Sequence, residues 1–136
     1  MDMPVTPPAI YRAACIEQAA QHYRAHSNLI RAVIEAEGGT TGKVSYNKDG
    51  SYDMGLMQIN SVHLVELARF GITSDMLINN ECLNILIGTY YLQRGILTAG
   101  TFWVGVGRYR SKTPSLNAEY QQRVWQRLER IQGGRP

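Results

Sequence analysis

The sequence predicts a single, mainly α-helical domain that contains one small β element. Apolar residues recur at helical spacing along most of the chain, and only residues 40–53 lose that period. The same stretch contains the turn signal Asn47-Lys48-Asp49-Gly50, which favours a β-hairpin or an irregular loop. With 136 residues, 44% of them hydrophobic, the chain can form one compact core but not two. We therefore expect one α+β domain over residues 10–131, with flexible tails at 1–9 and 132–136.

Two helices should precede the β element. Residues 10–25 carry Ile and Ala at loosely helical spacing and are expected to form the first helix. Either Ser27 or Asn28 can cap a second helix. That helix should end at Glu37, because the following Gly38-Gly39 pair favours a helix stop.

The later helices follow from boundary signals and from the width of their apolar faces. Ser61 can cap one helix, Ser74 can start a short one, and Asn80 can open the most apolar one. The helix that begins at Asn80 has the wide apolar face of a central helix, formed by Leu83, Leu86, Ile87, Tyr90 and Tyr91. Residues 101–109 should form another helix, and residues 117–131 an amphipathic terminal one.

Charge and hydropathy narrow the classes of function. The net charge of +3 favours an anionic partner, but the basic residues are scattered and do not predict nucleic-acid binding. No apolar run reaches the length of about 18 residues that a membrane-spanning helix needs. Residues 1–8 lack a basic region followed by an apolar core, so no secretory signal is visible. A cytosolic protein and an exported protein in its mature form both stay open, and the two cysteines are compatible with buried thiols.

Two glutamates at the end of the second predicted helix differ in the direction they face. At about 100° per residue, Glu37 falls on the apolar stripe of that helix and Glu35 on the opposite face. The stripe consists of Leu29, Ile30, Val33 and Ile34. Glu35 is expected on the surface beside Arg31, in an i,i+4 pair of small energetic value.

Glu37 is therefore the better candidate for acid–base chemistry. Burial disfavours the charged form of a carboxyl group and raises its pKa toward the range where it can donate a proton near neutrality. Cleavage of a glycosidic bond needs such a general acid. The alternative is that the apolar stripe ends at Ile34 and Glu37 is a solvated residue of the last turn.

Metal and cofactor sites are not predicted. If Gly50 were the invariant glycine of a calcium-binding EF-hand loop, the first and last ligands would be Ser45 and Leu56, and leucine cannot bind calcium. His22, His26 and His63 do not have the spacing of a metal site. We expect neither a metal nor a cofactor.

The segment from Asn47 to Ser61 carries a resemblance to a known family. Its second half, Gly55-Leu56-Met57-Gln58-Ile59-Asn60-Ser61, is similar to the signature of the soluble lytic transglycosylase domain. Its first half, Asp49-Gly50-Ser51-Tyr52-Asp53, resembles the strand and turn of animal lysozymes that end in their second catalytic carboxylate. The similarity extends over roughly residues 12–125 and is greatest to small accessory transglycosylases.

The resemblance implies a lysozyme-like fold with a small β-hairpin beside the active-site cleft. It makes Glu37 the catalytic acid and Asp53 a second catalytic or electrostatic carboxylate, although Asp53 could instead be a turn residue that accepts backbone hydrogen bonds. It makes Tyr109 the tyrosine that binds and orients the glutamate. It also implies a cleft lined by the run Gly55, Leu56, Met57, Gln58 and Ile59, in which Gln58 contacts the sugar.

The chain departs from the family pattern at two places. Gly38 stands where the family usually has a serine directly after its catalytic glutamate, so a hydroxyl that could position substrate is missing. Arg108-Tyr109-Arg110 stands where the family usually has Ala-Tyr-Asn, so the tyrosine is kept and its asparagine neighbour is not.

The resemblance also pairs the two cysteines and suggests a compartment. Family members join cysteines at the positions of Cys15 and Cys82, and such a bridge would stabilise the chain by about 4 kcal/mol in the loop-entropy model. A disulfide and a cell-wall substrate together imply the periplasm. The expected partners are a peptidoglycan strand and an envelope-spanning secretion, conjugation or pilus machine, with no nucleic acid.

Three functions stay open from the sequence. The first is a lytic transglycosylase that closes a 1,6-anhydro ring on N-acetylmuramic acid. The second is a hydrolytic muramidase with the same acid. The third is a wall-binding adaptor without catalysis.

Overall fold

The computed structural model describes residues 8–133, so residues 1–7 and 134–136 of the expected tails lie outside the described residues. Helices dominate this part of the chain, and three short strands form one antiparallel sheet, which confirms the predicted fold class. In chain order the elements are α1 (Pro8–Tyr23), α2 (Ser27–Glu37), β1 (Val44–Tyr46), β2 (Tyr52–Met54), β3 (Ile59–Asn60), the 3-10 helix η1 (Ser61–His63), α3 (Leu64–Ala68), α4 (Ser74–Asn79), α5 (Glu81–Thr98), α6 (Phe102–Gly107) and α7 (Pro114–Gly133).

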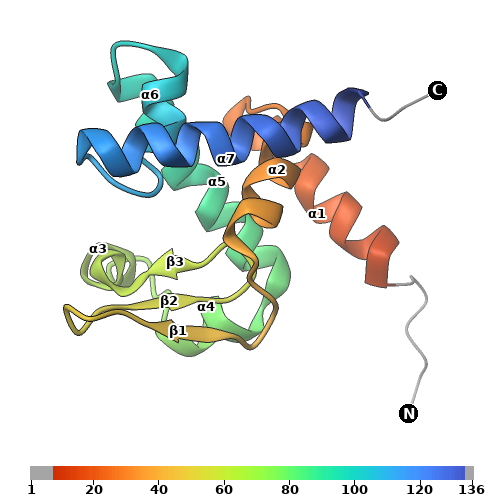
Figure 1. The fold of residues 1–136 in the computed structure, drawn as a ribbon. Helices are drawn as coiled ribbons and strands as arrows, with labels where there is room; N and C mark the ends of the chain where they lie inside the picture. Colours follow the sequence, from red (N-terminus) through yellow and green to blue (C-terminus); the bar gives the residue numbers. More distant parts are fainter. Residues whose placement is uncertain (1–7, 134–136) are drawn as a thin grey trace.

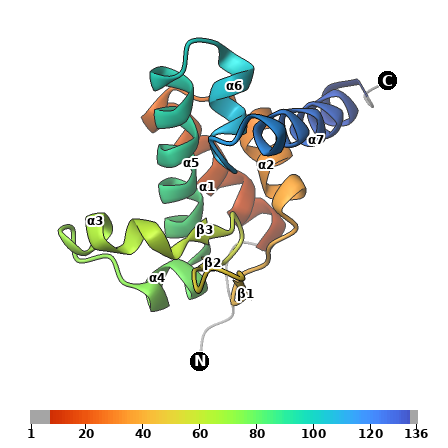
Figure 2. The same ribbon diagram turned by 60° about the vertical axis from the view of Figure 1, so that its left-hand side comes forward.

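The apolar helix α5 connects the two parts of the fold. It runs from the end of the molecule where α6 lies to the sheet (Figure 2). On the helical side α7 crosses the molecule with α2 packed beneath it, and the sheet lies below together with α3 and α4 (Figure 1). The core between these elements is formed by fully buried side chains that include Leu29, Ile30, Met54, Met57, Ile85, Leu92, Val106, Tyr120 and Val124.

The β element is larger than the expected hairpin. β1 pairs with β2 around the turn at Asn47-Lys48-Asp49-Gly50. β2 also pairs with β3, which lies beyond the residues expected to form the hairpin. In this register Asp53 on β2 lies opposite Asn60 on β3. The third strand therefore places Asn60, near the end of the transglycosylase-like motif, next to Asp53.

Helix caps differ from the predictions at two of three positions. The cap of α2 is His26, without a side-chain hydrogen bond, and neither Ser27 nor Asn28 caps it. The cap of η1 is Asn60, whose side chain accepts the Val62 N–H at 2.9 Å, and not Ser61. Asn80 does cap α5, as predicted, by accepting the Leu83 N–H at 3.0 Å. At η1 the error has a simple cause, because adjacent residues offer equally good acceptors.

A disulfide joins Cys15 of α1 to Cys82 in the first turn of α5, as the resemblance implied. Beside it, the Arg12 guanidinium donates two hydrogen bonds to the Glu81 carboxylate, at 2.9 and 2.8 Å. Thr41 donates a third hydrogen bond to the same carboxylate at 2.6 Å. These contacts fix α1 and the chain after α2 to the start of α5.

Candidate active site

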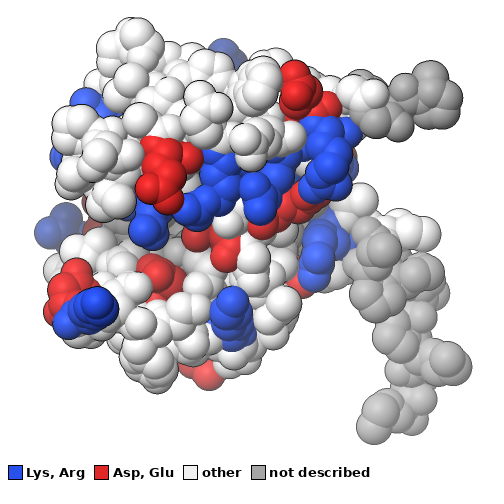
Figure 3. Space-filling model, viewed as in Figure 1, with Lys and Arg blue, Asp and Glu red and all other residues white. Residues whose placement is uncertain are grey.

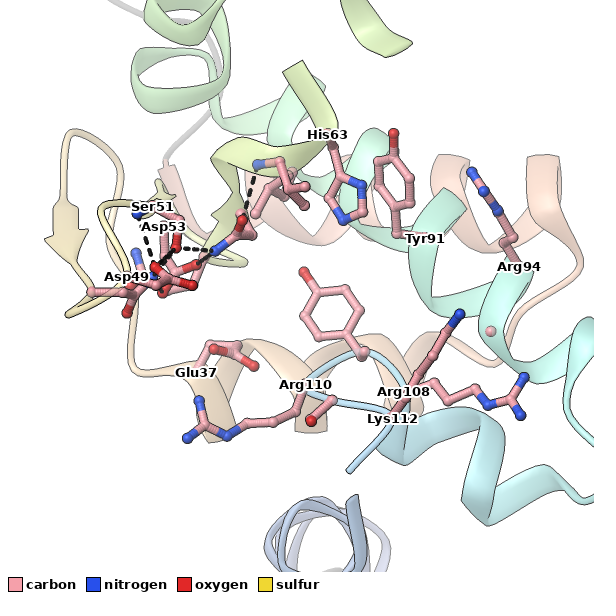
Figure 4. A pocket seen from close by; sticks show the side chains of 18 of the residues that line it. Glu37, Asp49, Ser51, Asp53, His63, Tyr91, Arg94, Arg108, Arg110 and Lys112 are labelled. Carbon is pink, nitrogen blue, oxygen red and sulfur yellow. Dashed lines mark hydrogen bonds between the residues drawn. The ribbon is translucent and has the colours of Figure 1, made fainter. Parts of the chain in front are cut away.

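A large hollow lies between the sheet and the helices. It has a volume of about 740 Å³ and is lined by residues of the sheet, of α5, of the end of α2 and of the segment that follows α6. Glu37, Asp49, Asp53, His63 and Arg110 are among the side chains on its walls (Figure 4). The two carboxylates singled out from the sequence therefore meet in one cavity.

Two glycines place Glu37, the last residue of α2, at this cavity. Gly38 ends the helix in the left-handed conformation, with φ of 64°, and donates its N–H to the Ile34 carbonyl. A serine at this position would be strained, because the left-handed conformation is unfavourable for residues with a Cβ atom. At Gly39 a Cβ atom would overlap the carbonyl oxygens of Gly55 and Leu56. Only glycine therefore lets the end of α2 come this close to residues 55–58, the motif loop between β2 and β3.

Glu37 is a partly buried acid with a raised pKa. The pKa of Glu37 is raised from 4.5 to about 7, mainly because burial disfavours the charged carboxylate and to a smaller extent because of the negative charge of Asp53. A hydrogen bond from Tyr120 and the positive charges of Arg110 and Arg123 act in the opposite direction. The burial that the helical wheel predicted is thus present, and it keeps a large fraction of Glu37 protonated at neutral pH.

The tyrosine that contacts Glu37 is Tyr120 and not Tyr109. The Tyr120 hydroxyl, on α7, donates a hydrogen bond of 2.6 Å to Glu37 Oε2. The Tyr109 hydroxyl donates instead to the Met57 carbonyl at 2.6 Å, and its ring stacks on Tyr120 with 6.3 Å between centroids. The expectation that Tyr109 forms a hydrogen bond with the glutamate is therefore wrong. Tyr109 holds the motif loop and supports Tyr120.

Replacing Tyr120 with Phe should raise the pKa of Glu37 further, by about one unit, because the lost hydrogen bond favours the ionised carboxylate. The measurement is an NMR titration of the Glu37 carboxyl carbon. Tyr109→Phe is the matched control, since it removes a neighbouring hydroxyl that does not bind Glu37. An unchanged pKa in Tyr120→Phe would show that this hydrogen bond does not set the titration of Glu37.

Asp53 is held by two side-chain amides. Asn60 donates to Asp53 Oδ1 at 3.0 Å, and Asn47 donates to Asp53 Oδ2 at 3.2 Å. The same two amides donate to the Ser51 hydroxyl, which in turn donates to Asp49 at 2.6 Å. The network fixes the Asp53 carboxylate in the cavity. Both oxygens of Asp53 accept hydrogen bonds from side-chain amides, whereas a turn residue would accept them from backbone N–H groups.

The motif loop between β2 and β3 is fixed by a buried asparagine on α5. The Asn84 amide donates to the carbonyls of Met54 and Leu77, at 2.9 and 2.8 Å, and its oxygen accepts the Met57 N–H at 2.8 Å. Gly55, with φ of 69°, leaves the space that this amide occupies. An asparagine among the apolar residues near the start of a helix is a sequence signal that could have revealed this role.

The motif residues do not all line the cavity as expected. Gln58 and Ile59 lie on its wall, whereas Leu56 and Met57 are fully buried in the core and Gly55 lies behind the wall. Gln58 has a φ of 51°, which is unusual for a residue other than glycine, and its side chain donates to the Gly55 carbonyl at 2.9 Å. Leu56 and Met57 therefore support the cleft from the core.

Outside the cavity, Glu35 is exposed as predicted, but its partner is Arg130 of α7 and not Arg31. Arg31 instead contacts Asn28 and Glu17. Within residues 8–133, no group of three or more His, Cys, Asp or Glu side chains could hold a metal ion. Over the same residues, no helix is long and apolar enough to cross a membrane.

Comparison with known proteins agrees with this geometry. Residues 14–123 match the model of the transglycosylase SLT domain. The invasion protein IagB of Salmonella typhimurium is 30% identical over 126 residues, which cover 89% of this chain and 79% of that protein. Protein IpgF of Shigella flexneri is 33% identical over 129 residues, which cover 91% and 85%. X polypeptide of Escherichia coli is 33% identical over 113 residues, which cover 82% and 67%. The chain belongs to the transglycosylase SLT domain family.

Proposed function

We propose that this protein is a peptidoglycan lytic transglycosylase that cleaves the β-1,4 bond between N-acetylmuramic acid and N-acetylglucosamine. The observation that carries the proposal is the partly buried Glu37 with a pKa of about 7, facing a cavity that it shares with Asp53. A general acid for glycosidic cleavage needs this combination of partial protonation and access to the substrate. The family membership supports the same substrate class.

The mechanism follows from the two states of Glu37. The protonated carboxyl group donates its proton to the glycosidic oxygen while the bond to the muramic C1 breaks, and positive charge develops at C1. The resulting Glu37 carboxylate then removes the proton of the muramic 6-hydroxyl, whose oxygen bonds to C1. The products are a 1,6-anhydromuramic end and a free N-acetylglucosamine end, and no water is consumed. Tyr120 orients Glu37 in both steps.

Analysis of the products by mass spectrometry tests the proposal. Purified peptidoglycan treated with the protein should yield glycans with 1,6-anhydromuramic ends, which are lighter by one water than their hydrolysed counterparts. Reducing ends would assign the site to a hydrolytic muramidase. The absence of cleavage would assign it to a wall-binding adaptor.

Asp53 would stabilise the developing positive charge, a role that the substrate's own acetamido group could share. Asp53→Asn should lower the rate of anhydromuropeptide release by about 100-fold, the effect expected when a preorganised charge is removed. Asp49→Asn is the control, because it neutralises another carboxylate on the same cavity wall that is not part of the mechanism. If both variants keep nearly the full rate, the acetamido group acts alone.

The compartment and the partner belong to the same proposal. The disulfide between Cys15 and Cys82 requires an oxidising environment, and the periplasm provides both that environment and the cell wall. One of the similar proteins bears the name invasion protein. We propose that the enzyme opens peptidoglycan locally for an envelope-spanning secretion, conjugation or pilus apparatus.

A further inference from the structure

The segment that follows α6 places three basic side chains on one wall of the cavity. Arg108, Arg110 and Lys112 are all exposed, and all three line the cavity. Two of them belong to the Arg108-Tyr109-Arg110 sequence that replaces the uncharged residues usual in the family. The mechanism proposed above uses none of the three.

The carboxylates of the cavity do not pair with Arg108 or Lys112. Within the described part of the chain, no hydrogen bond or ion pair joins the side chains of Arg108 or Lys112 to another residue. Glu37 is bound by Tyr120, and Asp53 by Asn47 and Asn60. These contacts leave Arg108 and Lys112 available to a ligand.

The basic side chains divide into two groups along the cavity. Arg110 lies beside Glu37, whereas Arg108 and Lys112 lie together toward the end where Arg94 is found (Figure 4). Arg94 is already paired with Glu66, at 3.0 Å. In the space-filling view, Lys and Arg gather along the α7 side of the hollow, and acidic side chains lie below them (Figure 3). The cavity is thus acidic where Glu37 and Asp53 meet and basic beyond that point.

We propose that Arg108 and Lys112 form an anion subsite that binds carboxylates of the peptide stem on muramic acid. The inference rests on the proposed function, because it takes peptidoglycan as the substrate. The sugars of the glycan are uncharged, so the fixed negative charges of the polymer lie on the stem peptides. A guanidinium and an ammonium without protein partners, both on the wall of a sugar-binding cavity, suit a ligand with more than one carboxylate. The enzyme would therefore prefer glycan strands that retain their peptide stems.

Co-sedimentation with insoluble peptidoglycan tests the subsite separately from catalysis. Every protein carries Glu37→Gln, so that no substrate is consumed. Its affinity is measured for peptidoglycan with intact stems, for glycan stripped by an amidase, and for peptidoglycan whose stem carboxylates are converted to neutral amides. We compare the affinity for peptidoglycan with intact stems with the affinity for stripped glycan. The double variant Arg108→Gln/Lys112→Gln should lower the ratio of these two affinities about fivefold, as expected for two exposed charge pairs. The same pair of substitutions should have no effect on the amidated material.

The matched control is Arg69→Gln. Arg69 is exposed and lies outside the cavity, and its loss should leave the affinity ratio unchanged. An unchanged ratio in the double variant would overturn the proposal, as would an equal fall in the Arg69 variant. An equal loss on intact and stripped material would also overturn it, because stripped glycan still has its free lactyl carboxylate. Failure of the proposed function gives a different result, since the protein with Glu37 would then release glycans with reducing ends or no cleaved glycan at all.

Discussion

Replacing Glu37 with Gln is expected to lower the release of anhydromuropeptides from peptidoglycan by about a thousandfold, which is within the range for loss of a general acid. Glutamine has nearly the same shape, and Tyr120 can still donate its hydroxyl hydrogen to the amide oxygen. The amide cannot supply a proton to the glycosidic oxygen. Initial rates followed by liquid chromatography and mass spectrometry measure the effect. Turnover near the rate of the unmodified protein would show that another group is the acid.

The stability of the same variant provides its folding control, with a sign that can be worked out. Folding raises the pKa of Glu37 from 4.5 to about 7, so the folded state binds the proton more tightly than the unfolded state. This contribution to stability is fully present below pH 4.5 and is lost as the pH rises through 7, by about 3 kcal/mol in all. Glu37→Gln has no such titration. Its melting temperature should therefore rise relative to the unmodified protein between pH 5 and pH 8.

A stability difference between the two proteins that does not change with pH would mean that Glu37 titrates near 4.5 in the folded state. It would also remove the argument for a proton donor at neutral pH, even if the variant were inactive. The two measurements on one substitution thus separate a mechanistic carboxyl group from a structural one.

The sequence predicted Glu37 because a local property decides its orientation. The apolar stripe of α2 sets the direction of the side chain, and the Gly38-Gly39 pair sets the end of the helix. Both can be read within a short stretch of sequence. The cysteine pair and the motif came from the family resemblance and needed no geometry.

Tyr120 was missed because its role depends on two segments that are 83 residues apart. On the sequence it is one of the apolar positions of the terminal helix, and such positions are usually core. Only the packing of α7 on α2 shows that its hydroxyl reaches Glu37. The third strand was missed for a related reason: β3 has two residues, and its pairing with β2 is what defines it.

Removing the disulfide is the second large effect that we expect. Cys15 and Cys82 are separated by 67 positions, and in the loop-entropy model a bridge over such a distance stabilises a protein by about 4 kcal/mol. A domain of this size has a total stability of about 5–15 kcal/mol, so the loss leaves it marginal. Cys15→Ala/Cys82→Ala should lower the free energy of unfolding in urea by this amount. Reduction of the unmodified protein should reproduce the loss, and reductant should not affect the variant.

Loss of the disulfide should also affect the active site, because α5 connects the two. Asn84, which fixes the motif loop, lies two residues after Cys82 in the first turns of that helix. Without the bridge, the ion pair of Arg12 with Glu81 is left to hold this end of α5 against α1, and its energetic value is small. Hydrogen exchange should then quicken more at the Met57 amide, which Asn84 binds, than at the Val124 amide in the middle of α7. Equal acceleration at both would mean that only global stability has changed. A selective increase would show that the disulfide, through α5 and Asn84, also holds the loop that contains Gln58.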